Sequence, residues 1–288
     1  MRENLTPALK RGEVVSSKLH RKPEDSCFLM GILNITPDSF YSNSRANGVE
    51  SAIKKALDMI ENGATWIDIG GESTRPGASP VSVEEEMKRV IPILKKLREI
   101  KPECMISVDT RRVEVAEMAI KHGADMINDI SGLRDQKMLN LIVQSGCSIC
   151  IMHMNGNPGN MQNNPKYDDV VSEVLDYLHN KAKQLIELGH PKNLIVIDPG
   201  IGFGKKLEHN LELLKSVEKF KQEGYSLLWG ISRKSMIGQI TGKEKSEDRF
   251  AGTIATSVFA NDNGVDILRI HDVDEHKDLF KVMDALRG

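Results

Sequence analysis

One short pattern recurs along the chain: an apolar run of β-forming residues ends in a polar side chain, and a helical stretch follows. The runs occupy residues 28–34, 65–71, 105–110, 126–131, 148–154, 194–200, 226–234 and 268–273. The polar residues at or near their ends are Asn34, Asp68, Asp109, Asn128, His153, Asp198, Lys234 and His271. Eight strands that alternate with eight helices predict an α/β fold of the (β/α)8 TIM-barrel type, whose active site lies at the carboxyl ends of the strands.

The intervening stretches have the period and the punctuation of helices. The helices are expected at about 48–62, 83–100, 112–122, 136–145, 168–189, 207–223, 247–263 and 274–286. Glycines at 63, 123, 146, 189 and 224 stand where five of these helices should end.

Length and composition favour a single domain. The chain has 288 residues, of which 40% are hydrophobic and 28% charged, enough for one barrel over residues 26–288. Residues 1–25 lack a clear period, and we expect them to form a short N-terminal arm, interpreted as a hairpin that closes the barrel bottom.

Charge and hydropathy exclude several classes of partner. With 39 basic and 41 acidic residues, no net field attracts nucleic acid or an anionic membrane. No apolar run approaches the roughly 20 residues of a membrane span, and the N-terminus has no apolar signal core. The sequence therefore predicts a cytoplasmic protein.

Four cysteines in so long a chain do not form a disulfide framework. Cys147 and Cys150 form a C-x-x-C pair, which could be a redox or a metal pair. Because the pair opens an apolar strand and no second pair exists, buried structural thiols are the favoured interpretation.

The last strand indicates an anion site. Arg269 and His271 are two residues apart, so they project to the same side and together suit a phosphate or a diphosphate. The loop at residues 70–79 is rich in glycine and presents Ser73, Thr74 and Arg75, a composition typical of a lid over an anionic substrate.

Four other strand ends indicate a flat, polar ligand. Asp109, Asn128, Asp198 and Lys234 bring two carboxylates, a carboxamide and an ammonium to one end of the barrel. Such a set suits a fused heterocycle rich in N–H groups and ring acceptors, although Asp109 or Asn128 alone could simply cap the following helix. The segment DPGIGFGK at 198–205 is not a Walker A loop, and its glycines would let Phe203 and the backbone approach that ligand.

Seven segments carry a further signal: MGILNITPDSF (30–40), GGESTRPGAS (70–79), VDT (108–110), INDIS (127–131), DPGIGFGK (198–205), GISRKSMIG (230–238) and RIHDV (269–273). Taken together, these segments resemble the signature motifs of the dihydropteroate synthases. The resemblance implies condensation of 6-hydroxymethyl-7,8-dihydropterin diphosphate with p-aminobenzoate, giving 7,8-dihydropteroate and pyrophosphate in folate biosynthesis. It also implies use of Mg²⁺, competition by sulfonamides and a homodimer.

The resemblance also distributes roles among the residues. The pterin-binding set would be Asp109, Asn128, Ile130, Met152, Asp198, Phe203, Gly230 and Lys234. The diphosphate would be held by Asn34, Arg75, Arg269 and His271, with Asn34 also helping to bind Mg²⁺. The p-aminobenzoate pocket would use Phe40, Thr74, Pro76, Lys234 and Ser235. Residues that act in catalysis would be Asp198, Lys234, Arg269 and His271.

We expect a dissociative substitution at the pterin methylene, with Asp198 offsetting the positive charge that develops. One departure concerns the first loop, where residues 41–44 read YSNS instead of the usual Ser-Asp-Gly-Gly, so closure would depend on Asp38 or Asn43. Three alternatives remain: a methyltetrahydrofolate-dependent methyltransferase, a non-catalytic pterin-binding homologue and a phosphate-handling barrel with another substrate.

Overall fold

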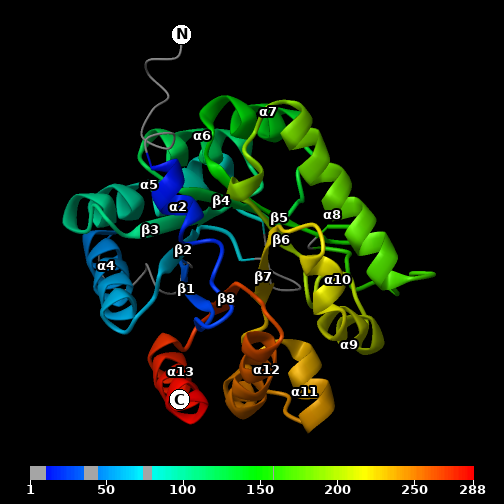
Figure 1. Cartoon of the computed structure of the whole chain (residues 1–288). Coiled ribbons are helices and arrows are strands. Elements are labelled where there is room, and N and C mark those ends of the chain that lie inside the picture. Colours follow the sequence, from blue (N-terminus) through cyan, green and yellow to red (C-terminus); the bar gives the residue numbers. More distant parts are fainter. Residues whose placement is uncertain (1–10, 36–44, 74–79, 158) are drawn as a thin grey trace.

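A computed structural model describes residues 11–35, 45–73, 80–157 and 159–288 of the chain. Its eight parallel strands form a closed barrel in which each strand pairs with the next and the last pairs with the first (Figure 1). The strands are β1 (Phe28–Asn34), β2 (Trp66–Gly70), β3 (Met105–Asp109), β4 (Met126–Asp129), β5 (Ser148–Met152), β6 (Ile195–Asp198), β7 (Ser226–Gly230) and β8 (Ile267–Ile270). Each lies inside one predicted run or within one residue of it, so the predicted (β/α)8 fold is confirmed.

The helices surround the barrel, as Figure 1 shows. They are α4 (Arg45–Glu61), α5 (Val83–Ile100), α6 (Val113–Lys121), α7 (Gln136–Ser145), α8 (Val170–Glu187), α9 (Leu207–Lys215), α10 (Val217–Lys221), α11 (Ser235–Thr241), α12 (Phe250–Asp262) and α13 (Val273–Arg287), with 3-10 turns η1 (Lys192–Leu194) and η2 (Ser246–Arg249). The five glycines predicted to end helices all have positive φ.

Two helix predictions differ from the structure. The helix expected over 207–223 is divided at Ser216, whose N–H bonds to the Leu213 carbonyl at 3.1 Å in a tighter 3-10 turn. The short helix α11 is not among the expected helices, and Gly238 lies within it. A side chain at Gly238 would place its Cβ 2.4 Å from the Lys243 carbonyl oxygen, so the close approach of the backbone explains the glycine.

The lower interior of the barrel is apolar. Each strand contributes one inward side chain to a single buried cluster: Met30, Trp66, Met105, Met126, Cys150, Val196, Leu228 and Ile267. Side chains alternate between the two faces of a strand, so the residues two positions later also point inward, nearer the carboxyl end. The interior of the barrel therefore has a packed apolar core towards the amino ends of its strands, and a functional site is expected at their carboxyl ends.

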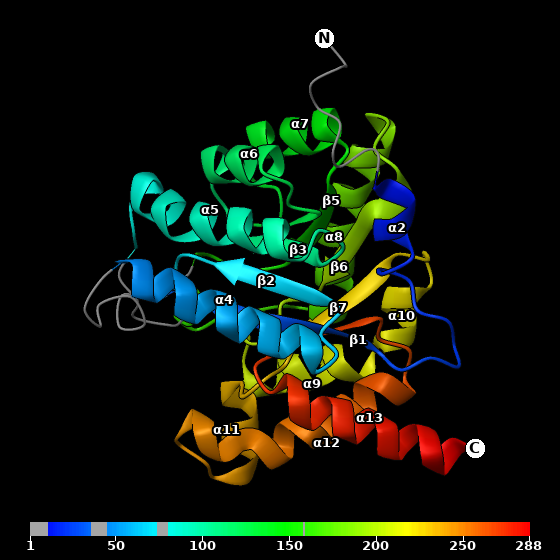
Figure 2. The same ribbon diagram turned by 90° about the vertical axis from the view of Figure 1, so that its left-hand side faces the viewer.

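The described part of the N-terminal arm closes the barrel bottom with a helix. Its helix α2 (Gly12–Ser16) lies at the end opposite the strand arrowheads (Figure 2). Val15 and Leu19 are buried in the same cluster as Trp66, whose Nε1 donates to the Lys18 carbonyl at 2.8 Å. The expected hairpin is absent from residues 11–25, because the buried Val15 and Leu19 are four positions apart, a spacing that suits a helical turn.

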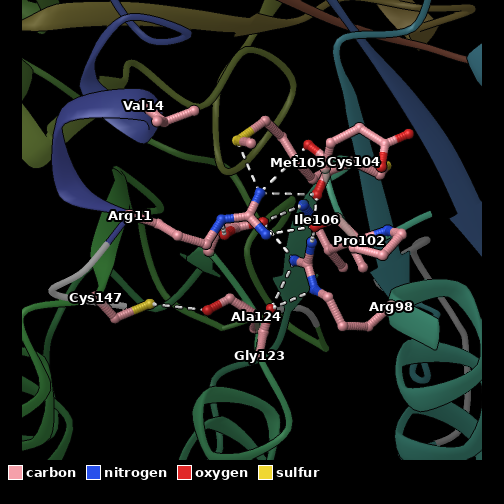
Figure 3. A network of polar contacts seen from close by, with 12 residues as sticks. Arg11, Val14, Arg98, Pro102, Cys104, Met105, Ile106, Gly123, Ala124 and Cys147 are labelled. Atoms are coloured by element: carbon pink, nitrogen blue, oxygen red, sulfur yellow. Dashed lines mark hydrogen bonds and ion pairs between the residues drawn. The ribbon is translucent and has the colours of Figure 1, made fainter. Parts of the chain in front are cut away.

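Arg11 of this arm and Arg98 of α5 both bind Asp125, which precedes β4, and so join the arm to the barrel. Arg11 Nε lies 3.1 Å from Asp125 Oδ1, and Arg98 Nη2 lies 2.6 Å from Oδ2. The guanidinium groups also donate to backbone carbonyls of residues 102–104 and 123 (Figure 3). We call Arg11, Arg98 and Asp125 the bottom cluster.

The cysteines are free and buried, as predicted. Burial raises the pKa of Cys147 and of Cys150 well above the ordinary thiol value, which leaves both as unreactive thiols. In the part of the chain that the structure describes, no helix has both the length and the hydropathy needed to cross a membrane.

Candidate active site

A polar layer lies directly above the apolar floor of the barrel. Asp68, Asn128 and Arg269 each stand two positions after a floor residue on their strands, so all three project inward. The strand register brings their neighbours to the same level, since Asp109 pairs with Asn128 and Gly230 pairs with Arg269. Adjacent strands thus deliver the predicted residues to one end of the barrel.

Arg269 binds two carboxylates at once. Its Nε donates to Asp68 Oδ2 at 2.6 Å, and its Nη2 donates to Asp109 Oδ2 at 2.7 Å. Asp68 Oδ2 also accepts from Asn128 Nδ2 at 3.2 Å. We call Asp68, Asp109, Asn128 and Arg269 the mouth cluster. The resemblance assigned Arg269 to the diphosphate and Asp109 to the pterin, whereas this structure joins them to each other.

The charges of the mouth cluster are not balanced. Burial, helped by the neighbouring Asp68 carboxylate, raises the pKa of Asp109 to about 7 in spite of the opposing charge of Arg269. Burial lowers the pKa of Arg269, but Asp68 and Asp109 outweigh this effect and the net shift is upward. An excess of carboxylate is suited to a ligand that donates N–H groups.

Asp198 and Lys234 form the second charged part of the mouth. Asp198 Oδ1 accepts from the Gly200 N–H at 2.7 Å, and Lys234 Nζ lies 4.1 Å from the centre of the Phe203 ring. Burial raises the pKa of Asp198 against the influence of Lys234, and burial lowers the pKa of Lys234 to about 8 against that of Asp198. The structure therefore brings together Asp198, Lys234 and Phe203 as predicted.

An apolar wall stands beside these charges. Ile130, Met152, Met154 and Met161 form a buried cluster of their own, and Phe203 packs against it. At Gly230 a Cβ would have no described heavy atom within 4 Å, so there is open space next to this glycine. A wall of methionine, isoleucine and phenylalanine next to carboxylates and an amide fits a flat heterocycle with polar edges.

Glycines of the loop at 198–205 are required by close approach of the protein's own backbone. Gly200 has φ of 68°, and a Cβ there would lie 1.9 Å from the His153 carbonyl oxygen. Lys205 then fixes the loop, since its buried Nζ donates to the carbonyls of His153, Gly200 and Phe203 at 3.1 to 3.3 Å. This arrangement holds Phe203 against the apolar wall.

His153 does not reach the mouth, contrary to the expectation that each strand end carries chemistry. It follows the inward Met152 and so points outward, where its ring packs edge-on against Tyr177 at 5.3 Å. Burial, helped by the charge of Lys205, lowers the pKa of His153 to about 3. A histidine that stays neutral at physiological pH in this position has a structural role.

His271 is oriented by Ser232, which follows β7. The Ser232 Oγ lies 2.9 Å from His271 Nδ1 and accepts the His271 backbone N–H at 3.3 Å. Between Ser232 and Lys234, Arg233 adopts a positive φ of 57° and forms a bidentate ion pair with Asp272. This strained turn sends Arg233 away from the mouth and lets Lys234 approach Phe203.

Asn34 lies at the mouth with an exposed side chain. A Cβ on Gly70 would lie 3.3 Å from Asn34 Oδ1 and 3.8 Å from Asp109 Oδ2, so the amide and the carboxylate flank the same point. Ser235 is the exposed first residue of α11. Phe40, Thr74, Arg75, Pro76 and the atypical residues 41–44 lie outside the described residues.

Sequence reasoning missed four residues near the site: Asp68 as a partner of Arg269 and Asn128, Met154 and Met161 in the apolar wall, and Ser232 beside His271. Asp68 carried a signal, because it shares its strand face with Trp66 and Gly70. Met161 carried none, since its position depends on the course of the loop after β5.

Comparison with known proteins identifies the relatives of this chain. The family described as pterin binding enzyme matches residues 30–271. The dihydropteroate synthase of Escherichia coli K12 is 46% identical over 257 residues, covering 89% of this chain and 90% of that protein. The Xanthomonas albilineans dihydropteroate synthase solved with 4-aminobenzoic acid is 40% identical, with a TM-score of 0.84 over 92% of this chain and 94% of that one. The same enzyme in complex with 7,8-dihydropteroate has a TM-score of 0.82 at 37% identity, covering 92% and 95% of the two chains.

Proposed function

Since this chain belongs to the dihydropteroate synthase family of pterin-binding enzymes, we propose that it condenses a 7,8-dihydropterin diphosphate with p-aminobenzoate. The products would be 7,8-dihydropteroate and pyrophosphate, so the protein is a transferase. The observation that carries this proposal is the juxtaposition of Asp109, Asn128 and Asp198 with an apolar wall at one end of the barrel. The relatives do not favour the methyltransferase, the non-catalytic homologue or another phosphate-handling barrel.

The mouth has the chemistry to bind a pterin. Carboxylates at Asp109 and Asp198 can accept N–H groups of the heterocycle, and Asn128 offers an amide between the floor and the wall. Ile130, Met152 and Phe203 supply apolar contact for the faces of the ring, and Gly230 leaves room beside it. Lys234 can donate to a ring acceptor from its place over Phe203.

The reaction is a substitution at the exocyclic methylene of the pterin. The C–O bond to the diphosphate breaks with its electron pair leaving on oxygen, and the arylamine nitrogen forms the new C–N bond and loses one proton. The buried Asp198 carboxylate can offset the positive charge that spreads over the dihydropterin as the C–O bond breaks. Because an arylamine is already neutral near pH 7, the chain needs no strong general base.

The leaving diphosphate requires cationic partners. Arg269 and His271 stand on the same face of the last strand, and Ser232 fixes the imidazole. Asn34 fits a magnesium ion carried by the diphosphate, because it presents an exposed amide oxygen and Mg²⁺ takes few protein ligands when phosphates supply the others. When bound, the ion would neutralise the diphosphate charge. Arg75 is proposed for the same group on the resemblance alone.

The arylamine site is proposed at the start of α11. Lys234 and Ser235 lie at the start of α11 and support a carboxylate-binding pocket, which Phe40, Thr74 and Pro76 are proposed to complete. Competition by sulfonamides follows if these residues bind p-aminobenzoate. The cytoplasmic location stays a prediction.

We also propose a homodimer through α12 and α13. Phe259 and Val282 are 42% and 59% exposed, and the half-buried Ile254, Val258 and Leu279 belong to the same pair of helices. Light scattering coupled to size-exclusion chromatography should give twice the 32.1 kDa mass of the chain. Val282→Glu should shift the protein to the monomer if this face forms the interface.

The decisive experiment for the activity is pyrophosphate release. The purified protein is incubated with Mg²⁺ and 6-hydroxymethyl-7,8-dihydropterin diphosphate, with and without p-aminobenzoate. Release that depends on p-aminobenzoate and yields dihydropteroate supports the proposal. Tight pterin binding without release would indicate a binding protein, and the atypical first loop would be examined first.

A further inference from the structure

Asp68 is the most buried carboxylate of the mouth cluster, and none of the roles assigned above uses it. Its side chain has no exposed surface, whereas that of Arg269 is 19% exposed and that of Asp109 is 9% exposed. Burial of a carboxylate costs free energy unless its charge is compensated, so the contacts of Asp68 indicate its role in the site.

The first contact fixes the orientation of the Asn128 amide. A carboxylate oxygen can only accept, so the Asn128 atom 3.2 Å from Asp68 Oδ2 must be the nitrogen. The Asn128 carbonyl oxygen is then left buried without a donor among the described residues. With Asp68 in place, the orientation of the Asn128 amide is fixed, and its unpartnered carbonyl oxygen is an acceptor available to a ligand.

The second contact gives Arg269 an anchor that does not depend on substrate. Arg269 uses Nε for Asp68 and Nη2 for Asp109, so the two carboxylates hold different nitrogens of one guanidinium. If a pterin N–H takes Asp109, the Nη2 end becomes available to an anion while Nε stays on Asp68.

We propose that Asp68 is a positioning residue of the active site, which holds Asn128 as an acceptor for the pterin and holds Arg269 ready for the diphosphate. This inference rests on the proposed function. In this role Asp68 acts through two separate neighbours, Asn128 and Arg269.

The choice of ligand separates the effect of Asp68 on Asn128 from its effect on Arg269. 6-Hydroxymethyl-7,8-dihydropterin carries no diphosphate and reports on Asn128, and its diphosphate ester reports on Arg269 as well. Asp68→Asn keeps the shape of the side chain and removes its charge. We expect Kd for the dihydropterin, measured by calorimetry, to rise about tenfold. KM for the diphosphate ester should rise by a factor about three times larger than this, because Arg269 is affected as well. KM for p-aminobenzoate should stay within twofold.

A double-mutant cycle tests whether Asp68 acts through Asn128. In an Asn128→Ala background, the effect of Asp68→Asn on dihydropterin binding should fall to less than threefold, because the amide it orients has been removed. A full tenfold effect in that background would overturn this branch of the proposal.

Asp125→Asn is the matched control, since Asp125 is also a buried carboxylate held by arginine but lies at the far end of the barrel. It should change thermal stability without changing the dihydropterin Kd. If Asp68→Asn is folded and binds both pterins like the wild type, the inference fails. If the wild type itself binds neither pterin, the proposed function fails instead. Should Asp68→Asn not fold, Asp68→Glu serves in its place, and the same outcomes apply.

Discussion

The two ends of this barrel each bury arginine with aspartate, but in opposite proportions. The bottom cluster has two guanidinium groups around one carboxylate, and the mouth cluster has one guanidinium between two carboxylates. At the bottom, backbone carbonyls take the remaining arginine donors. At the mouth, Asp68 Oδ1 and Asn128 Oδ1 are buried without a donor among the described residues.

This difference separates a structural network from a binding site. A network whose donors and acceptors are all satisfied has nothing to offer a ligand, and its value is to hold the arm against the barrel. A network with spare acceptors and excess negative charge gains hydrogen bonds only when a donor arrives. The mouth should therefore control activity and the bottom should control stability.

The largest expected effect is at the mouth, at Asp198. Asp198→Asn retains an oxygen for the Gly200 N–H but loses the negative charge, so kcat for dihydropteroate formation should fall by roughly 10² to 10³-fold. The melting temperature should remain near that of the wild type. An unchanged kcat would remove Asp198 from the mechanism.

The next effect concerns the bottom. Asp125→Asn leaves Arg11 and Arg98 without their counter-charge, so the free energy of unfolding should fall by about 2 to 3 kcal/mol while kcat stays the same. Urea denaturation measures the first quantity and steady-state kinetics the second.

Glu99→Gln is the control for the bottom prediction. It breaks the exposed ion pair with Lys96 and should cost less than about 0.5 kcal/mol. A comparable loss of kcat and stability in Asp125→Asn would show that the two ends are coupled, which contradicts the division of labour.

Much of this division could be predicted from the sequence. The polar ends of the apolar runs placed Asp109 and Asn128 at one end of the barrel, the two-residue spacing put Arg269 and His271 on one side, and the glycine positions marked the ends of helices. These features are local, so a single sequence reveals them.

Contacts across the barrel could not be predicted in the same way. The pair between Asp68 and Arg269 joins residues 201 positions apart, and Arg11 reaches carbonyls more than 90 positions away. The turn at Arg233 also has no local signal, because arginine rarely adopts positive φ and does so here while bonded to Asp272.

The third effect is the pH dependence of the mouth. With the pKa of Asp109 raised to about 7, a ligand that donates to its carboxylate should bind about tenfold more weakly at pH 6 than at pH 8. Calorimetry with 6-hydroxymethyl-7,8-dihydropterin at several pH values measures this slope, which Asp109→Asn should abolish.

The raised pKa of Asp109 also makes the stability of the unliganded protein depend on pH. Because folding raises this pKa above its ordinary value of 3.8, the folded state binds more protons between about pH 4 and pH 7. The contribution of Asp109 to stability is therefore present at low pH and is lost as the pH rises through 7. If Asp109→Asn keeps the wild-type slope in that window, another group is responsible for it.

The smallest effect compares two serine and histidine pairs with the same distance between hydroxyl and ring nitrogen. Ser232 Oγ lies 2.9 Å from His271 Nδ1 at the mouth, and Ser257 Oγ lies 2.9 Å from His276 Nε2 between α12 and α13. Ser232→Ala removes this hydrogen bond to His271, so KM for the dihydropterin diphosphate should rise about threefold, with KM for p-aminobenzoate unchanged. Ser257→Ala removes the same kind of bond away from the mouth and should lower stability by about 1 kcal/mol without changing either KM. If both variants alter the KM for the diphosphate substrate equally, the loss reflects general loosening of the fold, and His271 does not depend on Ser232 for its orientation.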